Sequence, residues 1–242
     1  MHNQDPNVRA GIYYYTGYST PTDFQIINNR LKGCYPSGIH IENGRNGIIS
    51  GNTFQPDSEG TNTKYGNKYA ISITMAYGLV ITNNLFKQTA SNGIIQLDNA
   101  NILSNINISN NNFNESSILL TNITNSLING NVFNKSHTTG QPSIKFDVSG
   151  SARRLINIIG NMFYNLGTAM AINIKNMEYM NINENIFENC SYPIYLQNNC
   201  RKYNILNNIS HTTTNTDFII YSNVSSADQA TITVANNIDD KS

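Results

Sequence analysis

Short runs of alternating apolar and polar residues recur along the chain. Residues 38–42, 70–74 and 143–147 are clear examples, and each has the period of two that is typical of a β-strand with one buried face. Isoleucine dominates these runs, as its β-propensity favours. No stretch keeps a helical period for more than two turns. The chain is therefore predicted to be all-β and built from many short strands.

A second pattern places phenylalanine two residues after asparagine at nearly regular intervals of 20 to 32 residues, about 26 on average. A sequence that repeats itself on this scale indicates a solenoid, in which each repeat packs only on its neighbours. The clear copies are Asn52/Phe54, Asn84/Phe86, Asn111/Phe113, Asn131/Phe133, Asn161/Phe163 and Asn185/Phe187, and weaker copies are Asn29/Leu31, Asn208/Ser210 and Asn237/Asp239.

Together the two patterns predict a single-stranded, right-handed parallel β-helix of about nine coils. Strands of successive coils would stack in parallel about 4.8 Å apart, giving a rod on the order of 45 Å long. The repeated phenylalanines would form one aromatic stack inside it. We expect one domain over 1–242, with coils from 11 to 238 and an extended N-terminal segment at 1–10.

Asparagine has two physical uses in such a fold. It tolerates the left-handed backbone of a tight corner better than any residue except glycine. Stacked asparagines can also hydrogen-bond from coil to coil as an amide ladder. A codon bias would explain why asparagine makes up 43 of 242 residues, but it would not explain the fixed offset to phenylalanine. The offset therefore predicts a ladder.

From about Gly11 to Asn237 the pattern resembles the right-handed parallel β-helix of the pectate-lyase-like superfamily. That superfamily includes polysaccharide lyases, polygalacturonase-type hydrolases and many phage tailspikes. The resemblance implies polysaccharide recognition, and of these members a bacteriophage tailspike or depolymerase segment is the most similar. It further implies a homotrimer, a virion (phage tail) or extracellular location and degradation of a capsule, O-antigen or exopolysaccharide.

Composition narrows the possible partners. Charged residues are 12% of the chain and the net charge is zero, which disfavours nucleic acid because that partner needs a basic face. No run reaches 18 apolar residues, so we expect no membrane span, and no signal peptide is visible. The three cysteines lack metal-binding spacing and are interpreted as buried small residues. We expect no metal and no cofactor.

The chain shows no amphipathic capping helix before its first strand, at 11–15, and outward tyrosines are expected at Tyr13 and Tyr15. Exposed apolar surface usually marks an interface. The chain is therefore interpreted as part of a longer protein or as one whose ends are covered by partner chains.

Aligned strand by strand, outward residues predict two surface columns. One contains Glu42, Asp98 and Asp147, each two coils from the next, and the other contains His40, Gln96 and Lys145. Carboxylates about 6.5–9.5 Å apart suit an inverting glycosidase. We therefore predict Glu42 as general acid and Asp98 as base, with Asp147 as a further catalytic candidate, and His40, Gln96 and Lys145 as substrate-binding residues.

The longest insertion, residues 55–68, would border this strip, and loops on a rigid scaffold often carry function. It supplies Asp57, Glu59 and Tyr65 as further substrate-binding candidates, with Tyr65 as a platform for a sugar ring.

Two alternatives to hydrolysis stay open. A non-catalytic carbohydrate-binding or structural β-helix of a virion or surface protein would also fit the fold. A polysaccharide lyase is a weaker alternative, because the Arg-x-Pro-x-x-Arg signature of pectate lyases is absent.

Overall fold

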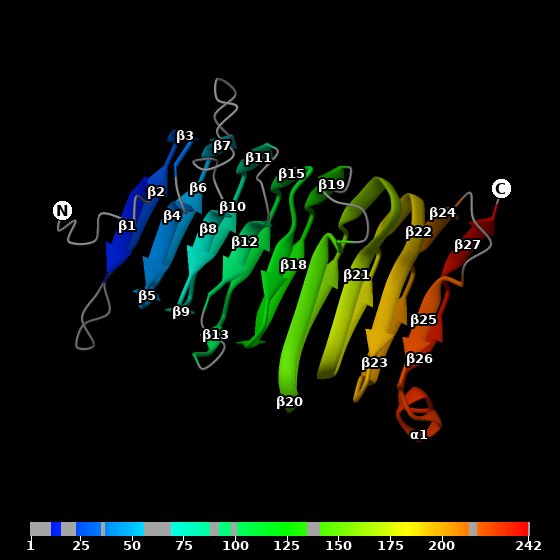
Figure 1. Ribbon diagram of the computed structural model, residues 1–242. Helices are drawn as coiled ribbons and strands as arrows, with labels where there is room; N and C mark the ends of the chain where they lie inside the picture. Colours follow the sequence, from blue (N-terminus) through cyan, green and yellow to red (C-terminus); the bar gives the residue numbers. More distant parts are fainter. Residues whose placement is uncertain are drawn as a thin grey trace.

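The computed structural model describes residues 11–15, 23–34, 37–55, 69–87, 92–97, 101–134, 141–212 and 217–241. These residues form a parallel β-solenoid of about seven turns, which confirms the predicted fold class, and the difference from nine coils is minor. Figure 1 shows an elongated stack with β1 at one end and β27 at the other. The only helix of the described part is α1 (Ser226–Gln229). The segment 1–10 lies outside the described residues.

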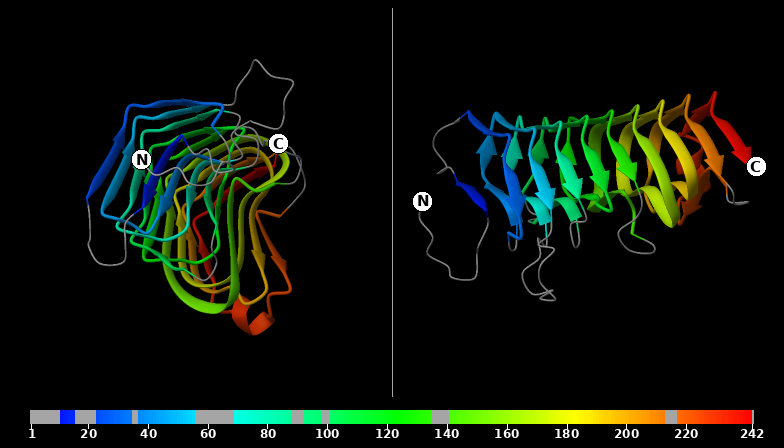
Figure 2. Two further views of the ribbon diagram at one scale, coloured as in Figure 1. Left: turned by 60° about the vertical axis from the view of Figure 1, so that its left-hand side comes forward. Right: turned by 90° about the horizontal axis from the view of Figure 1, so that it is seen from above.

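Strands at equivalent positions of successive coils pair in parallel and form three long rows, so successive coils have similar outlines (Figure 2). One of these, the His40 row, contains the strands that carry the predicted site residues. The long strands at the C-terminal end run around corners and contribute to more than one row. The His40 row consists of β1 (Ile12–Tyr15), β4 (Ser37–Glu42), β8 (Tyr69–Ile73), β12 (Asn92–Gln96), β16 (Ile118–Leu120), β20 (Ile144–Ile159), β21 (Met162–Asn183), β22 (Ile186–Gln197) and β25 (Ile219–Ser222).

The isoleucine row follows the His40 row along the chain. In eight strands of this row one isoleucine points into the core, and the equivalent position in the last strand is Val234, which is 46% exposed at the end of the stack. This row consists of β2 (Phe24–Ile27), β6 (Gly47–Ser50), β10 (Val80–Thr82), β14 (Asn107–Ser109), β18 (Ser126–Asn129), parts of β20 and β21, β23 (Arg201–Leu206) and β26 (Thr233–Ala235).

The phenylalanine row carries the predicted aromatic stack, which is confirmed. Neighbouring rings from Phe54 to Phe187 lie 4.5 to 5.1 Å apart between centroids and within 8° of parallel. All six rings are buried. The row consists of β3 (Arg30–Lys32), β7 (Thr53–Gln55), β11 (Leu85–Lys87), β15 (Asn112–Asn114), β19 (Val132–Asn134), the first residues of β21 and β22, β24 (Ile209–Thr212) and β27 (Ile238–Lys241).

Two glycines of the His40 row lie directly against rings of this stack. A Cβ on Gly38 would lie 2.9 Å from the ring carbon Cδ1 of Phe54, and one on Gly93 would lie 3.1 Å from Cδ1 of Phe113. A larger side chain at either position would collide with a ring that has no room to move. Glycine is therefore required because the aromatic stack passes directly beside the backbone.

The asparagine ladder is also present, and it consists of nine asparagines from Asn29 to Asn237. In each internal step one asparagine donates both its backbone N–H and its side-chain Nδ2 to the Oδ1 of the next, as Asn131 does to Asn161 at 3.0 Å. Its Nδ2 also donates to a backbone carbonyl of the preceding coil, here Ile108 at 2.9 Å. These amides are buried, so their polar groups are satisfied by one another rather than by water.

The left-handed corner belongs to a different residue from the one predicted. It is the residue before each ladder asparagine that has positive φ, as at Asn83 (φ 55°), Asn110 (φ 55°) and Gly130 (φ 61°). Asn110 Oδ1 would lie 2.6 Å from a Cβ placed on Gly130, so glycine leaves room for the asparagine side chain of the coil below. The sequence pattern predicts one asparagine for both the corner and the ladder. Two adjacent residues divide these tasks, because the ladder amide must turn inward while the corner residue faces out.

Four short strands form a small separate sheet between the His40 row and the isoleucine row. They are β5 (Gly44–Arg45), β9 (Ala76–Tyr77), β13 (Leu103–Ser104) and β17 (Ile123–Thr124). In Figure 1 the labelled members β5, β9 and β13 lie along the lower edge of the N-terminal half. This edge and the adjacent end of the His40 row hold the candidate site.

Candidate functional site

The predicted surface columns are wrong at β12. His40 pairs with Ser72 as expected, but Ser72 pairs with Ile95, and Gln96 pairs with the inward-facing Ile73. Because side chains alternate between the two faces of a strand, a one-residue shift moves Gln96 to the inner side. The equivalence of Gly38 and Gly93 was the signal in the sequence that could have set this register.

Gln96 is consequently buried and engaged by the backbone. Its Oε1 accepts hydrogen bonds from the backbone N–H groups of Thr121 (3.1 Å) and Asn122 (2.8 Å), and its Nε2 donates to the carbonyl of Asn101 (2.7 Å). This carboxamide stabilises the corner that follows β12 and β16. Such contacts give Gln96 a structural role in place of the predicted contact with substrate.

The same shift changes the partner expected for Glu42. The backbone N–H of Leu97 donates to the carbonyl of Ile73 at 2.9 Å, which places Leu97 in the column that was assigned to Asp98. Leu97 is 46% exposed there. Asp98 itself lies outside the described residues, as do Asp57, Glu59 and Tyr65 of the long insertion.

Asp147 is held by two lysines of its own row. Its carboxylate forms ion pairs with Lys145 at 3.3 Å and with Lys175 at 3.0 Å. Burial alone would raise the pKa of Asp147, but hydrogen bonds and charge from both lysines outweigh it and hold the pKa below its ordinary value. Glu42 lies four coils away, or roughly 19 Å along the stack, which is too far for the two carboxylates to act on one bond.

At the N-terminal end of the row, Glu42 has an aromatic partner. The hydroxyl of Tyr13 donates a short hydrogen bond to Glu42 Oε2, and the Tyr13 ring stacks on His40 with centroids 5.1 Å apart. The hydrogen bond to Glu42, together with partial burial and the negative charge, raises the pKa of Tyr13 to about 12. The structure therefore brings two of the predicted residues, His40 and Glu42, together around Tyr13.

Two serine hydroxyls in a hydrogen-bonded chain orient the His40 ring. Its Nδ1 lies 2.7 Å from Ser72 Oγ, which in turn lies 2.6 Å from Ser37 Oγ. Burial lowers the pKa of His40 more than the nearby Glu42 charge raises it, so the pKa of the ring lies below its ordinary value. Ser72 is fully buried, so its hydroxyl positions the ring and is closed to a ligand.

A shallow depression lies directly beyond Glu42, on the other side of the corner residue Asn43. Arg45 and Tyr77 pair across neighbouring strands of the small sheet, and Met75 and Ile102 contribute apolar surface next to them. Tyr77 is 53% exposed. The lining consists of Asn43, Gly44, Arg45, Met75, Ala76, Tyr77, Ile102 and Ser104.

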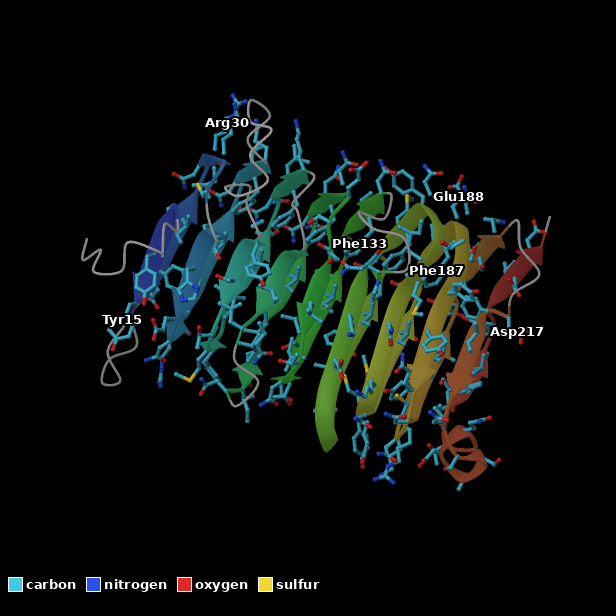
Figure 3. The ribbon with its side chains drawn as sticks, in the orientation of Figure 1. Tyr15, Arg30, Phe133, Phe187, Glu188 and Asp217 are labelled. Carbon is cyan, nitrogen blue, oxygen red and sulfur yellow. The ribbon has the colours of Figure 1, made fainter. Side chains whose placement is uncertain are left out.

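The two features are neighbours, because only Asn43 and Gly44 separate Glu42 from Arg45, and Tyr15 pairs with Glu42. We call the set Tyr13, Tyr15, His40, Glu42, Arg45 and Tyr77 the tyrosine patch. Figure 3 shows Tyr15 projecting from the solenoid at its N-terminal end. The predicted outward orientation of Tyr13 and Tyr15 is confirmed, with 49% and 54% of each side chain exposed.

Arg45 and Tyr77 are not among the site residues predicted from the sequence. Both precede a left-handed corner residue, Asn46 and Gly78, and Asn46 Oδ1 would lie 2.8 Å from a Cβ placed on Gly78. This recurrence in successive coils was the available signal. The patch offers flat aromatic faces, a hydroxyl, a carboxylate and a guanidinium, which together suit a ligand with both apolar faces and hydrogen-bonding groups.

A second charged cluster lies at the C-terminal end and has a structural role. The buried carboxylate of Glu178 accepts a hydrogen bond from Arg201 Nη2 at 2.6 Å, and Arg201 Nη1 reaches Asp228 of α1 at 3.7 Å. Arg201 thereby links α1 to β21. Lys202 lies over the Tyr179 ring, with Nζ 4.6 Å from the centroid.

Within the described ranges, no group of three or more His, Cys, Asp or Glu side chains could hold a metal ion. Cys190 and Cys200 are buried as predicted, and burial raises the pKa of Cys190 to about 12, whereas Cys34 is half-buried. No described helix is long and apolar enough to span a membrane.

Comparison with protein-family models, with curated proteins and with solved structures found no match to this chain. The fold and the site therefore define its class, a parallel β-solenoid with a stacked asparagine ladder.

Proposed function

We propose that this protein binds polysaccharide through the tyrosine patch. The observation that carries the proposal is that three tyrosines, each about half exposed, lie on the first three coils, with Glu42 beside Tyr13 and Tyr15, and Arg45 paired with Tyr77. A β-helix fold is consistent with proteins that bind or degrade polysaccharides. The capsule, O-antigen or exopolysaccharide expected from the sequence is the proposed ligand class.

The chemistry of the patch supports this ligand. Tyrosine gives a large, rigid contact area at a low cost in conformational entropy, and its hydroxyl can bond to a polar group at the edge of the contact. A sugar ring presents C–H groups on its faces and hydroxyls at its rim. Tyr77 can cover such a face, while Arg45 donates to rim hydroxyls and Glu42 accepts from them.

Binding without cleavage is favoured over hydrolysis by the positions of the acids. The two described catalytic candidates, Glu42 and Asp147, lie four coils apart, and Asp147 is neutralised by two lysines. Hydrolysis by Glu42 and Asp98 stays a prediction, as does lyase chemistry. The homotrimer and the virion or extracellular location also stay predictions.

The test is a binding titration of the chain against purified capsule, O-antigen and exopolysaccharide fragments, followed by calorimetry. Tyr77→Ala and Arg45→Gln should each weaken the affinity at least tenfold, and Tyr164→Ala on the phenylalanine row should leave it unchanged. A reducing-end assay on the same samples separates binding from cleavage. The proposal would be refuted if the chain bound none of the three glycan classes. It would also be refuted if the Tyr77 and Arg45 variants bound with the same affinity as the unmodified chain.

A further inference from the structure

Two outward columns of the isoleucine row contain no charged side chain. They take two residues from each of its nine strands, and the register aligns them along the length of the described stack. The charged residues Arg201 and Lys202 lie at the start of β23, outside these columns. We call this surface the neutral face. It consists of Gln25, Ile48, Val80, Asn107, Leu127, Asn157, Asn181, Asn204 and Thr233 in one column, and of Ile27, Ser50, Thr82, Ser109, Asn129, Ile159, Asn183, Leu206 and Ala235 in the other.

The other two rows of the same solenoid are different. The outward columns of the phenylalanine row contain Arg30, Lys32, Lys87, Glu188 and Asp240. Figure 3 shows Arg30 and Glu188 projecting from this upper side of the stack. The outward columns of the His40 row contain Glu42, Lys145, Asp147 and Lys175. Among the columns compared, only the two of the neutral face contain no charged residue.

Several side chains of the neutral face are already fixed by hydrogen bonds to one another. Asn204 Nδ2 donates to Asn181 Oδ1 at 2.9 Å, and Asn181 Nδ2 donates to Asn157 Oδ1 at 2.7 Å. Nearer the N-terminal end of the face, Ser109 Oγ donates to Thr82 Oγ1 at 3.2 Å. A surface that is ordered before it binds loses less side-chain entropy on association.

The size of the face fits a protein interface. Nine strands about 4.8 Å apart, each about four residues wide, cover roughly 600 Å². Two such faces in contact would bury roughly 1,200 Å², which is the lower limit of a specific protein–protein interface. Aliphatic side chains, among them Ile48, Val80 and Leu127, would supply the apolar part of that area, because each remains partly or fully exposed.

From this geometry we propose that the neutral face binds the neutral face of a second copy of this chain. Removal of charged groups from water opposes association, and this face has none to remove. Amide side chains both donate and accept, so a row of asparagines is complementary to a copy of itself. A single self-complementary surface gives a two-fold, isologous pair, in place of the trimer expected from the sequence.

The experiment is sedimentation velocity on the full chain over a range from low micromolar to several hundred micromolar. The expected result is a concentration-dependent species with twice the mass of the 26.9 kDa chain. The double variant Thr82→Lys/Asn181→Lys places two like charges on the face, and should weaken association at least a hundredfold.

The matched control is Asn112→Lys/Asn134→Lys, which adds the same charge to outward positions of the phenylalanine row and should leave association unchanged. Circular dichroism checks that both variants are folded. Three outcomes would overturn the proposal: a monomer at every concentration, a trimer, or a dimer that the control disrupts and the neutral-face variant does not. The proposal is independent of polysaccharide binding, which the titration above tests separately.

Discussion

Phe218 meets Phe187 edge-on, with ring centroids 5.8 Å apart and an interplanar angle of 74°, where every earlier pair of the aromatic column stacks nearly parallel. The column itself continues from Phe187 to Ser210, a small side chain that is fully buried. Phe218 comes from the chain segment just before β25 and is buried against Phe187, and we infer that it fills the space that Ser210 leaves. The core thus stays closed at the point where the sequence repeat loses its phenylalanine.

This relationship predicts a compensating pair of substitutions. Phe218→Ala should destabilise the protein by roughly 3–4 kcal/mol, because it opens a cavity beneath Phe187. Adding Ser210→Phe should restore part of that stability by continuing the parallel column, whereas Ser210→Phe alone should be destabilising through overpacking. Urea unfolding of the four proteins gives the coupling energy. Additive effects would show that the two side chains do not share one space.

Within the column, Phe133→Ala should cost roughly 3–5 kcal/mol, as expected for a buried aromatic ring with stacked neighbours on both sides. Met162→Ala, at an outward position in the adjacent coil, is the control and should cost less than about 1 kcal/mol. Thermal and urea denaturation measure both. A melting temperature unchanged by Phe133→Ala would refute the importance of the stack.

Replacing one ladder asparagine should be comparably severe. Asn131→Ala removes the acceptor of two bonds from Asn111 and leaves the carbonyl of Ile108 without its Nδ2 donor. Each buried polar group left unpaired costs about 1–3 kcal/mol, so we expect a loss of at least 3 kcal/mol. Asn112→Ala, an exposed neighbour, should change stability by less than about 0.5 kcal/mol. Equal effects of the two substitutions on urea midpoints would argue against the ladder as a stabilising element.

Asp147 predicts a small acid dependence of stability. Its pKa is lower in the folded than in the unfolded protein, so its contribution is complete above its ordinary pKa of 3.8 and is lost as the pH falls through the folded value. The side chain is 34% exposed, so solvent screening should keep the contribution to at most about 1 kcal/mol, and high salt should reduce it further.

The measurement is urea unfolding of the unmodified chain and of Asp147→Asn between pH 5 and pH 2. The difference in stability between the two proteins should decrease toward the acid end. A difference that stays constant across this range would contradict a lowered pKa at Asp147.

Local pattern determined the solenoid, because the spacing of Asn-x-Phe repeats with every coil and each copy can be read without knowing its neighbours. It also determined which phenylalanines stack, since the same offset from asparagine places each ring at the same point of the cross-section. Tertiary structure decided the rest. The two consecutive isoleucines of β12 fit either of two registers, so the sequence pattern does not fix its pairing. The pairing with β8 turns Gln96 inward and places Leu97 in the column of Glu42.

Contacts such as Arg45 with Tyr77, or Phe218 with Phe187, join residues separated by a full turn of chain that the repeat pattern does not mark. Side chains alternate between faces, so an error of one residue reverses what each of them meets. The sequence by itself therefore specified the coil, whereas the stacking register between coils decided which side chains share a surface.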